Sequence, residues 1–447
     1  MDQTDFGSNL TARGERRRLK AAIVVIFVYA SIVWLHLLPW GQWLILGLLL
    51  FMAIHGLRLL VSPPLPQPAG ATTNQSQDQE LPFFSLLVAA KNEEVVIANL
   101  VTSLCQLDYQ SDRWEVWIID DNSSDRTPEV LEKLKQKFPQ LKTIRRGADG
   151  KGGKSGALNQ VLPLTKGEII GVFDADAQIS ADFLHALVPL FQRPRTGAIQ
   201  LRKAIANAAH NFWTKGQSAE MALDIFFQDR RNRVGGIGEL RGNGQFVRRS
   251  ALLECGGWNE ETITDDLDLT IRLHLHQWDI GCLSFPAVQE EGVETFMQLW
   301  HQRNRWAEGG FQRYLDYWSA ILNSKMGFAK IADMSMFLLT QYLLPTAFVP
   351  DLIAAIALKQ QPLLAPIGGF ALVLSTIGMA FGIKRSYQVS WFSALVQTLR
   401  GTIYMLHWIP VMASVTLRMS IRPKRLKWVK TVHQGIGNSL ILDELES

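Results

Sequence analysis

The sequence is poor in cysteine and carries little net charge. Its 447 residues include three cysteines, an odd number without the spacing of a metal site. We therefore predict reduced, buried thiols in a cytosolic setting, not a disulfide framework. The formal net charge of +4 is too small to indicate nucleic acid as a partner. No internal repeat is evident, and the glycine-rich stretch at 150–156 lacks the spacing of a phosphate-binding P-loop.

Long apolar runs, in contrast, are present near both ends of the chain. Ala21–Trp40 has twenty residues without a formal charge, enough for a helix that crosses the hydrocarbon core. A break at Pro39–Gly41 separates it from a second run, Trp43–Leu60. A cleaved signal peptide is disfavoured, because the first run is long, lacks a small-residue cleavage site and leads into the second. Basic residues before the first run predict a cytoplasmic N-terminus, and two crossings return the chain to the cytoplasm.

The apolar runs of the C-terminal half are less regular. Met334–Leu358 carries two prolines and an aspartate, which predicts a kinked span. Ala365–Ile383 is uncharged and forms the clearest span of this half. Trp391–Met419 is long and apolar but contains Arg400. If it crosses, the basic tail that follows lies outside the cell, against the positive-inside rule, so it is alternatively re-entrant or interfacial.

The region between these runs alternates short apolar segments with helical patterns. The predicted strands are Phe83–Ala90, Glu115–Ile119, Lys142–Arg145 and Ile169–Phe173, and the predicted helices are Glu94–Gln106 and Pro128–Phe138. This alternation indicates an α/β fold, a mostly parallel sheet with helices on both faces. Ligands of such a sheet bind beyond the carboxyl ends of its strands.

The chain is thus predicted to insert an α/β domain between two groups of membrane helices. We expect a basic N-terminus with two transmembrane helices at 1–61, a linker at 62–80, a cytoplasmic α/β domain at 81–295, interfacial amphipathic helices at 296–330, transmembrane or re-entrant helices at 331–419, and a basic cytoplasmic tail at 420–447.

Acidic residues follow two of the predicted strands. Asp174 and Asp176 come directly after Ile169–Phe173, and alternate residues of an extended backbone project to the same side. Paired carboxylates fit a hard divalent cation, which takes oxygen ligands and keeps positions for water and substrate phosphates. Asp120 and Asp121 follow Glu115–Ile119 in the same way. A polar turn after a buried strand is the alternative for both pairs.

Two more motifs lie toward the end of this region. Thr264–Asp266 places two carboxylates at a predicted helix N-terminus, which the helix dipole favours even without a catalytic role. Gln302 and Arg305 are three residues apart, hence on one helical face, with Trp306 beside them. A guanidinium can pair with a diphosphate, and an indole can stack on a sugar. The alternative is an amphipathic helix at the membrane interface, where tryptophan is enriched.

In this fixed order, the motifs resemble those of the membrane-bound inverting glycosyltransferases of family two, over roughly residues 83–310. The resemblance implies a GT-A-type, Rossmann-like domain with a UDP-sugar donor and Mg²⁺ or Mn²⁺. It implies metal binding by Asp174 and Asp176, with Asp174 also at the donor. It further implies that Asp266 is the general base, supported by Asp265 where the family has glutamate. The remaining implied residues are Glu93, Asp121, Lys154 and Arg305 for the donor, and Gly244, Gln302 and Trp306 for the acceptor or diphosphate.

Three functions are compatible with such motifs: transfer of one sugar to a membrane lipid, processive synthesis of a β-polysaccharide, or a non-catalytic receptor. Because every expected charged position is filled, the receptor is disfavoured. The modest membrane part favours a lipid acceptor. The tail Lys427–Gly435 also resembles that of the cyanobacterial glucolipid synthases of this family, which implies UDP-glucose as donor, diacylglycerol as acceptor and a multi-pass protein of a plasma or thylakoid membrane. No residue by itself distinguishes the donor sugar.

Overall fold

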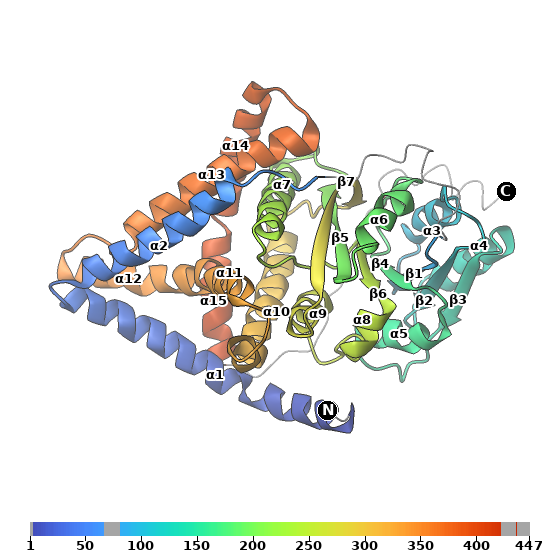
Figure 1. The fold of residues 1–447 in the computed structure, drawn as a ribbon, viewed down its shortest axis with the longest axis horizontal. Helices are drawn as coiled ribbons and strands as arrows, with labels where there is room; N and C mark the ends of the chain where they lie inside the picture. Colours follow the sequence, from blue (N-terminus) through green and yellow to red (C-terminus); the bar gives the residue numbers. More distant parts are fainter. Residues whose placement is uncertain (1–2, 67–80, 422–434, 436–447) are drawn as a thin grey trace. The chain divides into compact units, whose positions relative to one another are not determined.

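The computed structural model describes residues 3–66, 81–421 and 435 of the chain. The chain forms two compact units, shown with their element labels in Figure 1. The helical unit comprises Met1–Leu65, Asn211–Ile237 and Glu294–Lys427, and the α/β unit comprises Pro66–His210, Gly238–Val293 and Trp428–Ser447. Most of the predicted linker at 62–80 lies outside the described residues.

The α/β unit is built on a seven-stranded sheet in the order β3-β2-β1-β4-β6-β5-β7. In chain order the strands are β1 (Phe84–Ala90), β2 (Trp114–Asp120), β3 (Leu141–Arg145), β4 (Ile169–Phe173), β5 (Thr196–Ile205), β6 (Gln245–Arg248) and β7 (Asp279–Glu290). β1 is parallel to β2 and β4, β2 to β3, and β5 to β7, whereas β6 is antiparallel to β4 and β5. The predicted mostly parallel α/β sheet is confirmed.

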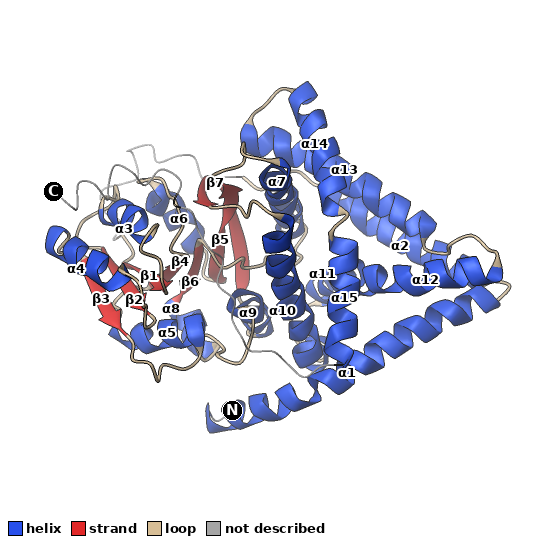
Figure 2. Cartoon of the chain, turned by 180° about the vertical axis from the view of Figure 1, so that it is seen from behind, coloured by secondary structure: helices blue, strands red, loops and turns tan. Residues whose placement is uncertain are grey.

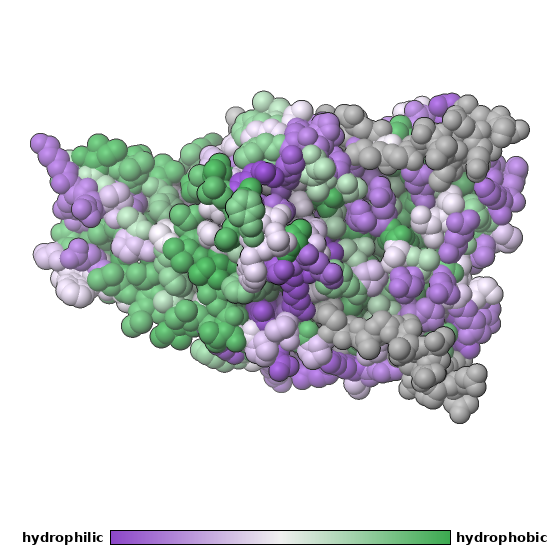
Figure 3. Space-filling model, turned by 90° about the horizontal axis from the view of Figure 1, so that it is seen from above, coloured by the Kyte–Doolittle hydropathy of each residue, from purple (hydrophilic) through white to green (hydrophobic). Residues whose placement is uncertain are grey.

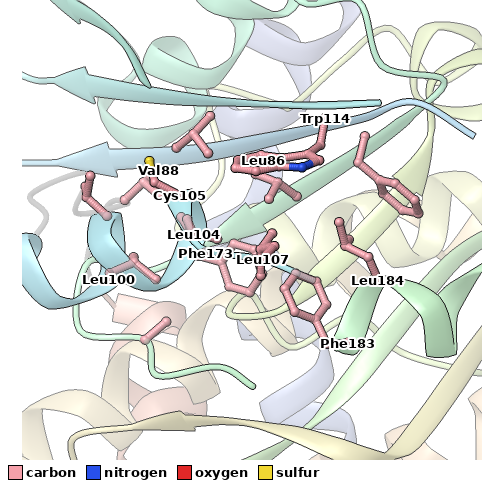
Figure 4. Packing of buried hydrophobic residues seen from close by; sticks show 14 of the residues in the cluster. Leu86, Val88, Leu100, Leu104, Cys105, Leu107, Trp114, Phe173, Phe183 and Leu184 are labelled. Atoms are coloured by element: carbon pink, nitrogen blue, oxygen red, sulfur yellow. The ribbon is translucent and has the colours of Figure 1, made fainter. Parts of the chain in front are cut away.

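Helices cover both faces of this sheet. They are α3 (Ile97–Cys105), α4 (Thr127–Lys137), α5 (Gly153–Val161), the short 3₁₀ helix Leu162–Leu164, α6 (Phe183–Phe191), α8 (Arg249–Glu254) and α9 (Asp265–Leu275). Leu86 and Val88 of β1 pack with α3, α4 and α6 in one core (Figure 4), while Leu87 packs with α5, α8 and α9 in the other. Consecutive residues of a strand face opposite sides, so β1 is apolar at every position except Ser85 because both of its faces are buried.

The four predicted strands are all present, with ends within one residue of the prediction. The helix predicted at Glu94–Gln106 begins only at Ile97. The chain between β1 and this helix forms a turn in which Asn92 has φ 56° and the Glu93 N–H donates to Thr127 Oγ1 at 2.8 Å. The polar residues after β1 are thereby held against the loop after β2.

The helical unit contains α1 (Gln3–Leu37), α2 (Gly41–Val61), α7 (Phe212–Arg233), α10 (Phe296–Leu322), α11 (Phe328–Leu338), a π-helical turn (Leu339–Leu343), α12 (Leu344–Leu358), α13 (Ala365–Tyr387), α14 (Trp391–Met405) and α15 (Trp408–Ile421). Figure 2 shows it as all-helical. Its interior includes an apolar cluster in which residues of α1 and α2 pack against residues of α12 and α13.

Within the part of this unit that the structure describes, four helical stretches are long and apolar enough to cross a membrane: Arg16–Leu37, Gly41–Val61, Phe328–Leu358 and Ala365–Tyr387. Large apolar side chains point outward from them, such as Phe27, Ile54 and Ile356, which are 70%, 62% and 71% exposed. Figure 3 shows the resulting hydrophobic surface over the helical unit. Exposed apolar area of this extent is unfavourable in water and favourable in lipid.

The long apolar run Trp391–Met419 is not one helix. It divides into α14 and α15, of 15 and 14 residues, with a break at Leu406–His407. Each is shorter than the roughly 20 residues that a membrane-crossing helix needs. Of the two alternatives that the sequence leaves open, these lengths favour the re-entrant or interfacial one.

Two basic residues at the start of the first span make structural contacts that the pattern of charges does not predict. Arg17 is buried and its guanidinium pairs with the Asp316 carboxylate of α10, while Lys20 Nζ donates to the Leu315 carbonyl at 2.7 Å. A buried charge is tolerated when it is paired and hydrogen-bonded. At least these two side chains therefore pack α1 against α10.

Candidate active site

The candidate site of the α/β unit begins where β1, β2 and β4 end at the same edge of the sheet. Asp121 follows β2, and its backbone N–H donates to the Ala90 carbonyl at the end of β1, at 2.8 Å. Arg146 Nη1 donates to Asp121 Oδ1 at 2.6 Å, and Lys91 Nζ lies 3.8 Å from Asp121 Oδ2. Two cations thus face this carboxylate. Arg146 is a site residue that sequence reasoning missed, since only the fold brings it to Asp121.

Glu93 lies in the turn after β1, at the same edge of the sheet. It is buried, and the neighbouring Asn92 accepts a hydrogen bond from the Ser124 N–H at 2.7 Å. The loops after β1 and β2 are therefore joined, and they bring Glu93 and Asp121 to one end of the sheet. This is where the resemblance places the residues that contact the nucleoside.

Lys154 lies in the first turn of α5, the helix entered through the glycine-rich loop. Gly152 has φ 77°, and a Cβ added there would lie 2.4 Å from Glu260 Oε2, so this turn requires glycine. Lys154 Nζ donates to Asp174 Oδ1 at 2.5 Å. Burial lowers the pKa of Lys154, but Asp174 and Asp265 outweigh burial and raise it. The ammonium is therefore held charged between the two acidic motifs.

Asp174 and Asp176 follow β4, as predicted. The Asp174 N–H donates to Asn243 Oδ1 at 3.2 Å, and the Glu291 N–H donates to Asp176 Oδ2 at 2.9 Å. Burial, followed by the carboxylates of Asp174 and Glu290, raises the pKa of Asp176 to about 7. Glu290, at the end of β7, was not predicted, because its strand is far away in the sequence.

These carboxylates form a site for which a divalent cation is a suitable ligand. Their mutual repulsion would be relieved by a positive charge, and their oxygens are the ligands that Mg²⁺ and Mn²⁺ prefer. Among the described residues, no group of three or more His, Cys, Asp or Glu side chains is arranged to hold a metal ion. Mg²⁺ sites commonly take one or two protein carboxylates and complete their coordination with substrate phosphates and water. The pair fits that pattern.

Asp266 lies in the first turn of α9. Its Oδ1 accepts a hydrogen bond from the Leu267 N–H at 2.8 Å, and its Oδ2 faces the backbone of Gly242, where an added Cβ would lie 3.4 Å away. Burial, followed by repulsion from Asp265, raises the pKa of Asp266 to about 6. A carboxylate with such a pKa can accept a proton near neutral pH.

The alternative explanation of this motif, helix capping, accounts for little of the geometry. Thr264 is the N-cap residue, yet its side chain makes no capping hydrogen bond, and its hydroxyl has no partner in the described part of the chain. Asp268, the next acid, accepts instead from Asn259 Nδ2 at 2.9 Å and Arg272 Nε at 2.7 Å. Asp265 acts on Asp266 through its charge.

The loop before β6 is fixed close to Asp266. Gln200 of β5 is buried, donates to the Asn243 carbonyl at 2.8 Å and accepts from the Arg241 N–H at 2.7 Å. Gly244 has φ 71°, and a Cβ added there would lie 2.7 Å from Val288 Cγ1. A side chain is therefore excluded at Gly244, which the resemblance places at the acceptor.

The remaining predicted site residues belong to the helical unit. Gln302, Arg305 and Trp306 are half-buried residues of α10. A capping box between Thr295 and Gln298 begins this helix. The helical spacing that the sequence predicts for the three residues is therefore present.

The C-terminal tail is described at one position. The Gly435 N–H donates to Glu291 Oε2 at 3.2 Å, and the backbone of Glu291 also holds Asp176. The rest of the tail segment singled out in the sequence, 427–434, lies outside the described residues. Glu291 thus links the backbone of Gly435 to Asp176 of the acidic pair.

Comparison with known proteins gives three findings. A family model described as "Glycosyltransferase like family 2" matches residues 82–309. The β-monoglucosyldiacylglycerol synthase of Trichormus variabilis is 58% identical over 435 residues, 96% of this chain and 92% of that protein. The protein of the same name from a Synechocystis species is 54% identical over 439 residues, 97% of this chain and 91% of that protein.

Among solved structures, the mannosyltransferase PcManGT from Pyrobaculum calidifontis, in complex with GDP-Man and Mn²⁺, has a similar fold. The likeness covers 85% of this chain and 99% of that one, with a TM-score of 0.55 and 19% sequence identity. At that identity the likeness shows the fold alone.

Proposed function

The chain belongs to glycosyltransferase-like family 2 and is a glycosyltransferase, and from this premise we propose that it transfers glucose from UDP-glucose to 1,2-diacylglycerol. The product is β-monoglucosyldiacylglycerol, a glycolipid precursor. The observation that carries the chemistry is the half-buried Asp266 carboxylate, with its pKa of about 6, in a unit whose acidic pair is linked to Lys154. The names of the two relatives, whose similarity spans nearly the whole chain, support glucose as the transferred sugar and diacylglycerol as the acceptor.

In this reaction the lipid hydroxyl oxygen attacks the anomeric carbon from the face opposite the diphosphate. Asp266 takes the hydroxyl proton, the bond between the anomeric carbon and the diphosphate oxygen breaks, and UDP leaves with the bonding electrons. Such inversion needs a single carboxylate base on the acceptor side. Lys154, charged at neutral pH, offsets the negative charge that develops on the leaving diphosphate.

The acidic pair would hold Mg²⁺ or Mn²⁺, which would neutralise the diphosphate. The nearby Glu93 and Asp121 are suited to bind the uridine, with Arg146 fixing the Asp121 carboxylate. We assign Gly244, where Val288 excludes a side chain, to the acceptor. On α10 we assign Arg305 to the donor and the other two motif residues, Gln302 and Trp306, to the acceptor or diphosphate.

The test of this proposal is a comparison of donors and acceptors with the purified protein in detergent. We expect label from UDP-glucose in the lipid fraction only when diacylglycerol and Mg²⁺ are present, and little transfer from GDP-mannose or UDP-N-acetylglucosamine. Label in a high-molecular-weight polymer formed without lipid would support a processive polysaccharide synthase instead and would overturn the proposal.

Activity is expected to fall at acidic pH, because the base works only when ionised. The raised pKa of Asp266 places the midpoint of the acidic limb of kcat/KM at about 6, with activity present above it and lost below. The profile should be measured at saturating Mg²⁺, so that protonation of Asp176 does not compete with metal binding. Because Asp265 raises this pKa, Asp265→Asn should move the midpoint to lower pH. A flat profile from acidic to neutral pH would contradict the assignment of the base.

The membrane arrangement is proposed to have both chain ends and the α/β unit in the cytoplasm. Four crossings return the chain to its starting side, and α14 and α15 add no complete crossing. In intact cells, an impermeant thiol reagent should label Gln361→Cys, between α12 and α13, and should miss Ser390→Cys, between α13 and α14, until the membrane is permeabilised. Labelling of Ser390→Cys in intact cells would contradict this topology.

A further inference from the structure

The motif turn of α10 has two faces with different surroundings. Gln302, Arg305 and Trp306 lie within about 100° of one another around the helix and are half-buried. The intervening residues, Arg303 and Asn304, lie on the adjoining, inner side of the helix and are 0% and 7% exposed. The two positions that the Gln-x-x-Arg-Trp motif leaves unspecified are therefore the buried ones.

Arg303 contacts two of the three motif residues directly. Its Nη1 donates to Gln302 Oε1 at 2.8 Å, and its guanidinium lies over the Trp306 ring, 4.0 Å from the centroid. An arginine that stacks and donates at once fixes both neighbours, because its planar group has little freedom to rotate. The orientation of Gln302 and Trp306 thus depends on where Arg303 is held.

Glu220 of α7 holds Arg303 in place. Its Oε2 accepts from Arg303 Nη2 at 2.5 Å and from the Tyr404 hydroxyl at 3.0 Å, and its Oε1 accepts from Trp408 Nε1 at 2.8 Å. A buried carboxylate is stable only with such a full set of donors. Tyr404 ends α14 and Trp408 begins α15, so the cluster lies at the break between these helices.

The cluster is closely packed against α7. A Cβ added at Gly216 of α7 would lie 2.2 Å from Tyr404 Cδ2, so the ring rests directly on the α7 backbone. On the other side of the motif turn, Arg418 of α15 donates to Asn304 Oδ1 at 3.1 Å and to Glu308 Oε2 at 3.3 Å. Both unspecified motif positions are anchored to α14 and α15.

We propose that Arg303 is a positioning residue, held by Glu220 and Tyr404, that orients Gln302 and Trp306 toward the lipid acceptor. The α14–α15 segment, in which neither helix alone is long enough to cross the membrane, thereby sets the geometry of the acceptor face of α10. This inference rests on the proposed lipid glucosyltransferase function and adds residues to it that the motif does not specify.

The test is Arg303→Lys, which keeps the charge but loses the stacked plane and the fork of donors. We expect kcat/KM for diacylglycerol to fall by about tenfold or more, with a raised KM for diacylglycerol and an unchanged KM for UDP-glucose. Tyr404→Phe, which removes one hydroxyl from the cluster, should give the same pattern to a smaller extent. If Arg303→Lys fails to fold, Tyr404→Phe alone decides the question.

Arg17→Lys is the matched control, since Arg17–Asp316 is another buried ion pair on α10 without contact to Gln302 or Trp306 in the described part of the chain. It should lower Tm while both KM values stay unchanged. A purely structural Arg303 would behave like Arg17, with less active protein and both KM values intact, and that result would overturn the inference. Failure of the wild-type protein to glucosylate diacylglycerol would instead refute the proposed function.

Discussion

Asp266→Asn is expected to lose transfer by about 10²-fold to 10⁴-fold in kcat, the range of a general base. Asparagine has the shape of aspartate and keeps the hydrogen bond from the Leu267 N–H, but it cannot take the acceptor proton. Binding of UDP-glucose should remain, because the base acts on the acceptor. Tm should be unchanged or higher, since the substitution removes repulsion with the half-buried Asp265. Titration calorimetry with UDP and a single-turnover assay measure the two effects separately.

Asp268→Asn provides the control from the same turn of α9. Its carboxylate pairs with the buried Arg272, so the variant should lose stability while the folded enzyme keeps its kcat. Asp266→Asn is thus expected to lower kcat without lowering Tm, whereas Asp268→Asn is expected to lower Tm without lowering kcat. Near wild-type turnover by Asp266→Asn would remove the proposed mechanism.

Asp174→Ala and Asp176→Ala are each expected to abolish transfer. Each removes one of two carboxylates that would hold the cation, and with it the neutralisation of the diphosphate. In contrast to Asp266→Asn, both should weaken UDP binding in the presence of Mg²⁺. The loss should be much smaller when Mg²⁺ is omitted, which titration with and without the metal measures.

Asp182→Ala is the control for general loss of charge near the pair, since Asp182 is exposed and makes no side-chain cap with α6. It should bind and turn over as the wild type does. Equal UDP affinity of Asp176→Ala and the wild type at saturating Mg²⁺ would contradict the metal role.

The first half of the sheet is predictable because each strand carries its own signal. β1, β2 and β4 are short apolar runs followed by polar residues, and this pattern needs no partner to be recognised. Glu290 and Arg146 could not be found in that way. They reach the acidic residues only through pairing of distant strands and loops, and neither belongs to a motif that spacing would reveal.

Helix α7 shows a second limit of pattern reasoning. It lies in the sequence between β5 and β6 but packs in the helical unit. Its buried residues include Gln217, Glu220, Gln228 and Asp229, so hydrophobic periodicity does not mark its inner face. Two of them, Glu220 and Asp229, are buried because Arg303 and Arg385 satisfy them, and those partners come from other helices.

The central claim, a single inverting transfer to a lipid hydroxyl, is tested most directly by the structure of the product. Purified protein should be incubated with UDP-glucose, Mg²⁺ and diacylglycerol, and the lipid product analysed by mass spectrometry and by the anomeric proton coupling in its NMR spectrum. We predict one glucose per lipid in β linkage, and none with Asp266→Asn. An α-linked glucose, or a chain of several glucose units, would contradict the account.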